Sequence, residues 1–348
     1  ATTPNETNGE AVATAGTAND PTALNLSGKK LVIGTQAKAA GLYVYVAQEL
    51  GLFEDAGLDV EIVTFASGAP INEAMAAGEL DVAVSGMATV YALATGMYTY
   101  IGDGTITVNG QAIYARADSD IAKAGVYSGN IIGSAETVKG CSILGPLSTA
   151  AHYNAISYVK AFDLTSDDFS MVSMEYAQAY EAFITGQGDL LATTPPYTSQ
   201  LAADPNYVKV ADLYDVMGAP LVDTISVQNE VAERGDDLVA LLDCLYTAMD
   251  ILATDDTLRA EYGMRIYASE GTTYTEDDMA SEIANQSYFT WDMLREDVYE
   301  FGATMINIGA FFVDQGMIEA DDYPNIEASM DHSFIERAIA YHDAKNAE

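Results

Sequence analysis

The strongest candidate for a ligand site is the run Gly145-Pro146-Leu147-Ser148-Thr149, where an apolar stretch gives way to helical spacing. Its two hydroxyl groups, together with the unpaired N–H groups of a first helical turn, would favour an anion or another hydrogen-bond acceptor. Ala150 and His152 follow, and His152 shares a helix face with Ser148. Because no orienting carboxylate or nucleophile elbow accompanies it, we interpret His152 as a cleft donor or a packed helix residue, not a catalytic base. Ser148 could equally be a plain helix cap.

Further loops carry small, polar or aromatic residues where predicted strands end. Gly68 permits close approach of the backbone, and Ser67 is placed to cap the next helix. Asp223, beside a later strand, could pair with a cationic group of a ligand or stabilise a hinge, whereas Lys38 is expected on the solvated surface. Caps, tight turns or core packing would explain each of these residues as well. The candidate ligand contacts outside the first run are Gln36, Ser67, Gly68, Ser85, Gly86, Met87, Tyr176, Pro196, Tyr197 and Asp223.

Two stretches of the chain repeat the order strand, helix, strand, helix, strand. The first runs from Leu31 to Val84 and the second from Ser142 to Ala192, and Gly78 and Gly186 end the second helix of each. Short apolar strands that alternate with helices predict parallel β-α-β units. We therefore expect an α/β protein with two lobes, whose strand ends and helix N-termini face one cleft.

After about Val231 the apolar spacing becomes helical, in residues 238–252, 258–266, 277–289 and 298–312. This tail should pack on the first lobe, because its apolar stripes cannot remain exposed. The chain must then cross between the lobes twice, near residues 113–116 and 224–227, and two such connections form a natural hinge. We expect a disordered tether in residues 1–27, a first lobe made of 28–112 and 226–348, and a second lobe in 113–225.

Composition argues against several classes of protein. Asp and Glu number 52 against 14 Lys and Arg, a net charge of −38, so a basic surface for nucleic acid is absent. Cys141 and Cys244 lie far apart and the chain has three histidines, which predicts buried thiols without a metal site or cofactor. Residues 82–102 are uncharged over the length of a membrane span, but their Ser, Thr and Gly content favours a strand, a turn and a short helix.

The first 27 residues are poor in apolar side chains and begin at Ala1. We interpret them as the tether of an exported protein, periplasmic or at the cell surface, whose signal peptide has been removed. Lipid anchoring stays open, through a Cys that is not part of this sequence. An artificially trimmed end is the alternative.

Several runs, in their order and spacing, resemble one family over about residues 29–340. They are residues 42–47, 51–61, 65–68, 77–82, 148–153 and 331–336. They resemble the solute-binding components of ABC importers in the sulfonate, taurine and nitrate group, which share their fold with thiamine-pyrimidine-precursor binding proteins. The resemblance implies a type II periplasmic-binding-protein fold that closes around a ligand and docks on a membrane permease. Carried over by position, the cleft would be lined by Ser67, Gly68, Gly86, Met87, Ser148, Thr149, Ala150 and His152.

The resemblance leads us to expect a non-enzymatic monomer that delivers a small anionic organic solute, such as a sulfonate or taurine, to an ABC permease. Pro195-Pro196-Tyr197 and Glu175 depart from the group's usual pattern, so a pyrimidine or an aromatic acid stays open as the ligand. An enzyme on the same scaffold is a further alternative. The pyrimidine-synthesising enzymes of this fold carry clustered cysteines, which this chain lacks.

Overall fold

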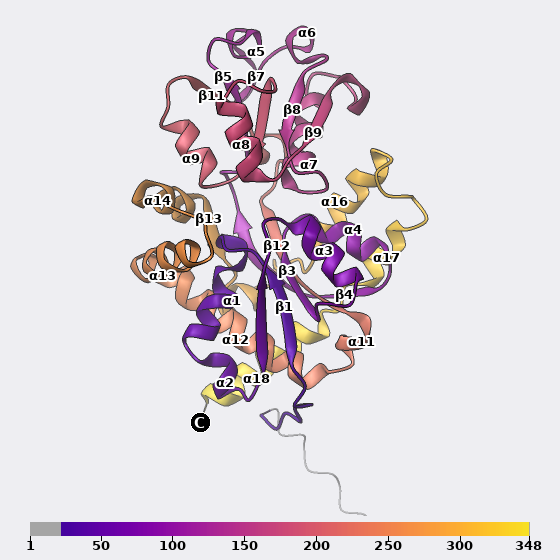
Figure 1. Cartoon of the computed structure of the whole chain (residues 1–348). Helices are drawn as coiled ribbons and strands as arrows, with labels where there is room; N and C mark the ends of the chain where they lie inside the picture. Colours follow the sequence, from indigo (N-terminus) through magenta and orange to yellow (C-terminus); the bar gives the residue numbers. More distant parts are fainter. Residues whose placement is uncertain (1–21, 348) are drawn as a thin grey trace, which may run out of the picture.

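The computed structural model describes residues 22–347, and two sheets organise this part of the chain (Figure 1). The larger sheet has the strand order β13-β4-β12-β3-β1-β2. Strands β2 and β3 flank β1 in parallel, and β12 runs antiparallel between β3 and β4. The strands of this sheet are β1 (Leu31–Thr35), β2 (Val60–Thr64), β3 (Val82–Ser85), β4 (Tyr98–Thr107), β12 (Leu221–Gln228) and β13 (Gln286–Tyr288).

The second sheet has the order β11-β5-β10-β8-β9. Strands β9 and β10 flank β8 in parallel, while β5 runs antiparallel to β10 and β11. Its strands are β5 (Ala112–Arg116), β8 (Ser142–Gly145), β9 (Ser170–Ser173), β10 (Leu190–Thr193) and β11 (Tyr207–Asp212), and a small ribbon is formed by β6 (Val126–Ser128) and β7 (Ile131–Ile132). The predicted repeat is confirmed, because β1, β2 and β3 correspond in order and pairing to β8, β9 and β10.

Helices cover both sheets and connect their strands (Figure 1). Up to β12 they are α1 (Ala39–Glu49), α2 (Leu52–Asp55), α3 (Gly68–Ala76), α4 (Thr89–Ala94), α5 (Asp120–Lys123), α6 (Ala135–Val138), α7 (Ala150–Lys160), α8 (Tyr176–Ile184), α9 (Tyr197–Ala202) and α10 (Leu213–Met217), with a 3-10 turn at Ser166–Asp168. After β12 follow α11 (Asn229–Ala232), α12 (Gly235–Thr254), α13 (Asp256–Ser269), α14 (Glu276–Asn285), α15 (Trp291–Leu294), α16 (Ala303–Asp314), α17 (Tyr323–Ala328) and α18 (Ser333–Asn346).

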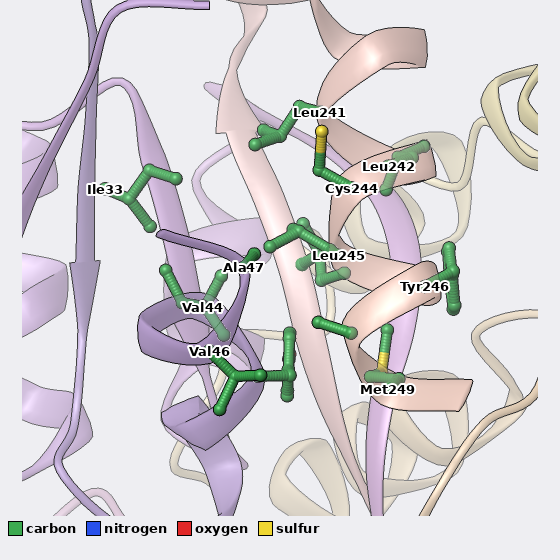
Figure 2. Close-up of a cluster of buried hydrophobic side chains, with 14 of the residues drawn as sticks. Ile33, Val44, Val46, Ala47, Leu241, Leu242, Cys244, Leu245, Tyr246 and Met249 are labelled. Atoms are coloured by element: carbon green, nitrogen blue, oxygen red, sulfur yellow. The ribbon is translucent and has the colours of Figure 1, made fainter. Parts of the chain in front are cut away.

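The C-terminal helices pack on the first sheet, as the sequence predicts. Figure 2 shows Leu241 and Leu245 of α12 beside Val44 of α1 and Ile33 of β1, all fully buried in one hydrophobic cluster. Burying an aliphatic side chain of this size contributes about 1.5–3 kcal/mol. This packing fixes α1 on the sheet and thereby places its N-terminus beside the end of β1.

The expected helix 277–289 is wrong in its last part. Helix α14 ends at Asn285, and Gln286–Tyr288 form β13, which extends the sheet by pairing antiparallel with β4. Gln286 and Tyr288 are buried while Ser287 is exposed, the alternation typical of a strand. The expected helix 298–312 begins later, at Ala303, because Gly302 has a left-handed φ of 68° and precedes the first turn.

The chain passes between the sheets twice, after β4 and before β12. The two connections are joined by hydrogen bonds, from Gly110 N to an Asp212 carboxylate oxygen at 3.1 Å and from Leu213 N to Gln111 O at 2.7 Å. The expected crossings near residues 113–116 and 224–227 lie instead within β5 and β12, because these β-prone runs pair inside the sheets. The exact lobe boundaries stay a prediction, and the expected one at 225/226 falls inside β12.

Most of the expected tether, residues 1–21, lies outside the described residues. Ser27, near its end, donates its backbone N–H to the Asp237 carboxylate at 2.8 Å, at the start of α12. Cys141 and Cys244 are buried free thiols, as predicted. Among residues 22–347, no helix combines the length and the apolar character that crossing a bilayer requires.

Candidate functional site

A small cavity of about 40 Å³ lies between the two sheets, at the ends of their strands. We call it the inner cavity. Residues of both lobes and of the C-terminal helices line it: Gln36, Lys38, Ala39, Ala40, Gly68, Gly86, Met87, Ala88, Gln111, Thr149, Ala150, Tyr176, Thr194, Pro195, Leu221, Asp223, Tyr274, Glu282 and Gln286. Eight of the fourteen predicted ligand contacts are among them: Gln36, Gly68, Gly86, Met87, Thr149, Ala150, Tyr176 and Asp223.

Four helices of nine residues or more begin at this cavity. The first residues of α1, α3 and α8, and Thr149 and Ala150 at the start of α7, belong to its wall. None of the four has a side-chain hydrogen bond at its N-cap. The N–H groups of a first helical turn have no acceptor within their own helix, so these four ends present donors and positive helix dipoles around one small space.

Four predicted contacts line neither the inner cavity nor the larger pocket next to it, described below: Ser67, Ser85, Ser148 and His152. Ser67 occupies the N-cap of α3, but its hydroxyl donates to Glu175 Oε1 of the other lobe at 3.3 Å. Ser85 is buried behind Gly68, where a Cβ added to the glycine would lie 2.8 Å from the serine Oγ. Direct contact of these residues with a ligand stays a prediction.

Ser148 and His152 contact each other at the start of α7. The cap of α7 is Thr149, and Ser148 has a left-handed φ of 56° that turns it out of the helix. Its backbone N–H donates to His152 Nδ1 at 3.3 Å. Burial lowers the pKa of His152 to about 4, so the ring is neutral near pH 7 and accepts this hydrogen bond.

Asp223 reaches the inner cavity from β12. It is 6% exposed, and within residues 22–347 its carboxylate has no hydrogen-bond donor and no ion pair within 4 Å. Gly86 leaves room for it, since a Cβ at that position would lie 2.7 Å from Asp223 Oδ1. Burial raises the pKa of Asp223 to about 7, and Lys38 opposes that rise.

Lys38 lies partly buried at the N-terminus of α1, contrary to the expected solvated position. Its ammonium group is 5.2 Å from the centre of the Tyr176 ring, a cation–π contact between the lobes. Burial lowers the pKa of Lys38, and the carboxylates of Asp223, Glu175 and Glu282 offset part of that effect.

Glu282 of α14 brings a second buried carboxylate to the inner cavity. Its Oε1 accepts from the Tyr267 hydroxyl at 2.9 Å and lies 3.8 Å from the guanidinium of Arg259, which is itself 2% exposed. Burial raises the pKa of Glu282, and Arg259 opposes the rise. The site thus gathers several ionisable groups within a space that holds few waters.

A second pocket of about 550 Å³ adjoins the inner cavity and shares five lining residues with it: Gln36, Lys38, Tyr176, Thr194 and Pro195. We call it the outer pocket. Pro196 and Tyr197, two further predicted contacts, belong to its wall together with Phe65. Its wall includes the starts of α8 and α9 and residues 270–273 between α13 and α14, and Figure 1 shows α8 and α9 above α13 and α14. Its wall mixes apolar residues such as Phe65 and Pro196 with polar ones such as Gln200 and Glu270, and it has room for a larger substituent of a ligand that extends from the inner cavity.

Most of the chain matches a known family. The family model described as the NMT1-like family matches residues 27–266. The chain belongs to the NMT1-like family. A protein of Brachyspira hyodysenteriae, named as an ABC transporter periplasmic binding protein, is 27% identical to this NMT1-like protein over 292 residues, which cover 83% of each chain.

Solved structures of solute-binding proteins share the fold. The alkanesulfonate-binding protein SsuA from Xanthomonas axonopodis pv. citri, bound to MOPS, has a TM-score of 0.66 at 17% identity, covering 87% of this chain and 98% of its own. The periplasmic nitrate-binding protein NrtA from Synechocystis PCC 6803 has a TM-score of 0.67 at 15% identity, covering 91% of this chain and 88% of its own. The expected two-lobed periplasmic-binding-protein fold is confirmed. This NMT1-like protein is a substrate-binding component of an ABC transporter and not an enzyme.

Sequence reasoning missed the part of the site that comes from the C-terminal segment. Tyr274, Glu282 and Gln286 line the inner cavity of this NMT1-like protein although they follow β3 by about two hundred residues. The sequence of this segment predicts a helix, although its last three residues form the strand β13. No residue pattern within the segment indicates that it reaches the cleft. For Lys38 the sequence did hold a signal that it faces the cleft, since it is a cation in the loop between a predicted strand and the helix that follows. The structure places it at the N-cap of that helix, α1.

Proposed function

We propose that this protein captures a small organic solute in the inner cavity and that an anionic or acceptor group of the solute, such as a sulfonate, binds at the helix N-termini. The observation that carries the proposal is the convergence of four helix starts without side-chain caps, two from each lobe, on one cavity. The names of the two fold neighbours, an alkanesulfonate-binding and a nitrate-binding protein, agree with an anion at this place.

Hydrogen bonds from these helix N-termini would supply enough free energy to bind a ligand with micromolar affinity. A charge-assisted hydrogen bond contributes about 1.5–3 kcal/mol, so several would supply the roughly 8 kcal/mol of micromolar binding. We further propose that the protein works outside the cytoplasmic membrane as a monomer and that its closed form docks on the permease. The contacts between Ser67 and Glu175 and between Lys38 and Tyr176 support a form in which the lobes enclose the ligand.

A thermal-shift screen of taurine, alkanesulfonates, nitrate, aromatic acids and pyrimidines tests the proposal. A ligand at a hundred times its Kd stabilises the folded state by about 2.7 kcal/mol, which appears as a rise in Tm. Binding of a sulfonate or carboxylate is the expected result. Failure of every anion in the panel to raise Tm would overturn the proposal.

The helix donors can be tested directly with Ala150→Pro. Ala150 is the first residue of α7 and follows the extended Thr149, so proline fits the backbone while its N–H is removed. We expect calorimetric affinity for the bound anion to fall about 10- to 150-fold, the equivalent of one charge-assisted hydrogen bond. Ala135→Pro makes the same change at the exposed first residue of α6 and should leave affinity unchanged. Equal affinity in the two variants would remove the α7 N-terminus from the site.

A further inference from the structure

We infer that Gln111, a residue of the first connection between the two sheets, hydrogen-bonds the bound solute and couples occupation of the inner cavity to the angle between the lobes. The inference rests on one part of the proposed function, because it takes the inner cavity as the place where the solute binds. Gln111 is not among the ligand contacts predicted from the sequence. It is the last residue of the connection, since β5 begins at Ala112.

The Gln111 side chain belongs to the wall of the inner cavity and ends in an unpaired amide oxygen. It lines the cavity together with Thr149 and Ala150 at the start of α7, and the residue is 8% exposed. Within residues 22–347 its buried Oε1 has no hydrogen-bond partner. Buried polar atoms are normally hydrogen-bonded, and leaving one unpaired is costly. A terminal amide accepts at its oxygen and donates at its nitrogen, so this group can bind a hydroxyl, an N–H or an anionic oxygen of the solute.

The backbone of Gln111 joins the two connections and α7. Its carbonyl oxygen accepts from Leu213 N, in the second connection, at 2.7 Å and from Asn154 Nδ2 of α7 at 3.0 Å. Asn154 is 1% exposed and lies about one helical turn after Ala150, the first residue of α7. A shift of Gln111 therefore changes hydrogen bonds to both connections and to the helix whose N-terminus lines the inner cavity.

The residue before Gln111 allows the connection to turn. Gly110 has a left-handed φ of 98°, a conformation that favours glycine. A Cβ at this position would lie 3.6 Å from Cγ of Pro195, which lines the inner cavity. A few residues at the ends of elements can absorb the rotation of one lobe against the other. Gln111 thus lies between a point of rotation and the space that the solute occupies.

A solute can favour one lobe arrangement only if it binds that arrangement more tightly than the other. The hydrogen bonds from Leu213 and Asn154 fix the backbone of Gln111, so its amide reaches the solute in one setting of the connection. A solute held by the α7 N-terminus and by Gln111 at the same time therefore favours this setting. The other helix starts at the cavity lack such a direct link to the connections.

Calorimetry of Gln111→Met tests the contact, with taurine, ethanesulfonate, nitrate, benzoate and cytosine as probes. Methionine resembles glutamine in length and leaves the backbone hydrogen bonds in place, so the ligand-free variant should keep the Tm of the wild type. We expect affinity for the probe that binds the wild type most tightly to fall about 2- to 10-fold, the equivalent of one hydrogen bond between uncharged groups. Gln187→Met makes the same change at an exposed glutamine outside the cavity and should leave affinity unchanged.

A double-mutant cycle tests the coupling. Asn154→Leu removes the side-chain donor to the Gln111 carbonyl, although Asn154 itself lines neither pocket. If both residues act through the same connection, the fold-losses of Gln111→Met and Asn154→Leu should not multiply in the double variant. Small-angle scattering examines the coupling with single variants. Saturated with the same probe, Gln111→Met should keep a larger radius of gyration than the wild type, whereas Ala150→Pro should reach the wild-type value.

The outcomes separate this inference from the proposed function. Wild-type affinity in Gln111→Met, fold-losses that multiply, or a saturated Gln111→Met as compact as the wild type would each overturn the inference and leave the proposed function intact. If cytosine alone binds and Gln111→Met weakens it with incomplete closure, the inference holds while the anion at the helix N-termini is wrong. If no probe binds the wild type, both fail.

Discussion

At the scale of single residues, Asp223 and His152 are buried titratable groups with opposite consequences for stability. Burial raises the pKa of Asp223 from 3.8 to about 7 and lowers the pKa of His152 from 6.5 to about 4. Lys38, Tyr43, Tyr176 and Tyr288 are the titratable groups whose charges couple to Asp223. The fold therefore keeps Asp223 neutral between pH 3.8 and about 7, and His152 neutral between about pH 4 and 6.5, where both side chains would be charged in the unfolded chain.

The Asp223 shift predicts a pH-dependent stability of the ligand-free protein. The folded state binds the Asp223 proton more tightly than the unfolded state does. The contribution of this group to the free energy of unfolding is therefore fully present below about pH 4 and is lost as the pH rises to 7, by on the order of 4 kcal/mol. His152 acts in the opposite direction, since stability is lost as the pH falls from 6.5 toward 4. Asp223→Asn should therefore remove the decline and make the ligand-free protein more stable than the wild type at pH 8.

Urea unfolding at pH 4.5, 6 and 7.5 measures this difference. The gap between Asp223→Asn and the wild type should widen with pH, while Glu270→Gln, at an exposed carboxylate, should follow the wild type. Parallel curves for Asp223→Asn and the wild type would show that Asp223 is not held in a strongly desolvated place.

At the scale of elements, the sequence predicted the repeated strands and helices but not every contact of the site. Local patterns located β1 to β3 and β8 to β10, because apolar runs, turn glycines and helical spacing are encoded within a few residues. The contribution of α14 and β13 was missed, because it depends on where a distant segment packs. Among the hydroxyl residues at loop ends, Thr149 lines the cavity, whereas the Ser67 hydroxyl donates to Glu175 and the Ser148 backbone N–H donates to His152, so contact of these two serines with a ligand stays a prediction.

The start of α3 depends on a glycine at its closest approach to the next helix. A Cβ at Gly68 would lie 2.7 Å from Ala88 Cβ and 2.8 Å from Ser85 Oγ. Gly68→Ala should therefore lower the free energy of unfolding by about 1–3 kcal/mol through overpacking, as measured by urea titration. Ala76→Ser, at the exposed end of the same helix, should change it by less than about 0.5 kcal/mol. Equal stabilities of the two variants would show that α3 and α4 can separate freely.

At the scale of the whole molecule, the lobes touch in a second region away from the cavity. Lys160 Nζ of α7 lies 3.1 Å from Asp314 of α16, and the rings of Tyr153 and Phe311 are 4.3 Å apart. Figure 1 shows α16 extending from the first lobe toward α7 of the second. Because these contacts join the lobes without lining the inner cavity, they should favour the closed arrangement independently of the ligand's chemistry.

Removing this second contact should weaken ligand binding only by destabilising the closed form of the protein. An aromatic pair contributes about 0.5–1.5 kcal/mol and an exposed ion pair less, so the double variant Lys160→Ala, Phe311→Ala should bind the ligand roughly 2- to 15-fold more weakly. Small-angle scattering of its ligand-free form should show a larger radius of gyration than the wild type, and saturating ligand should remove the difference. Lys139→Ala removes a matched surface pair, with Asp168 at 3.2 Å, inside the second lobe and should change neither property. If the double variant also kept wild-type affinity and dimensions, the α7–α16 contact would not control closure, and the lobes would be held together by the cavity residues themselves.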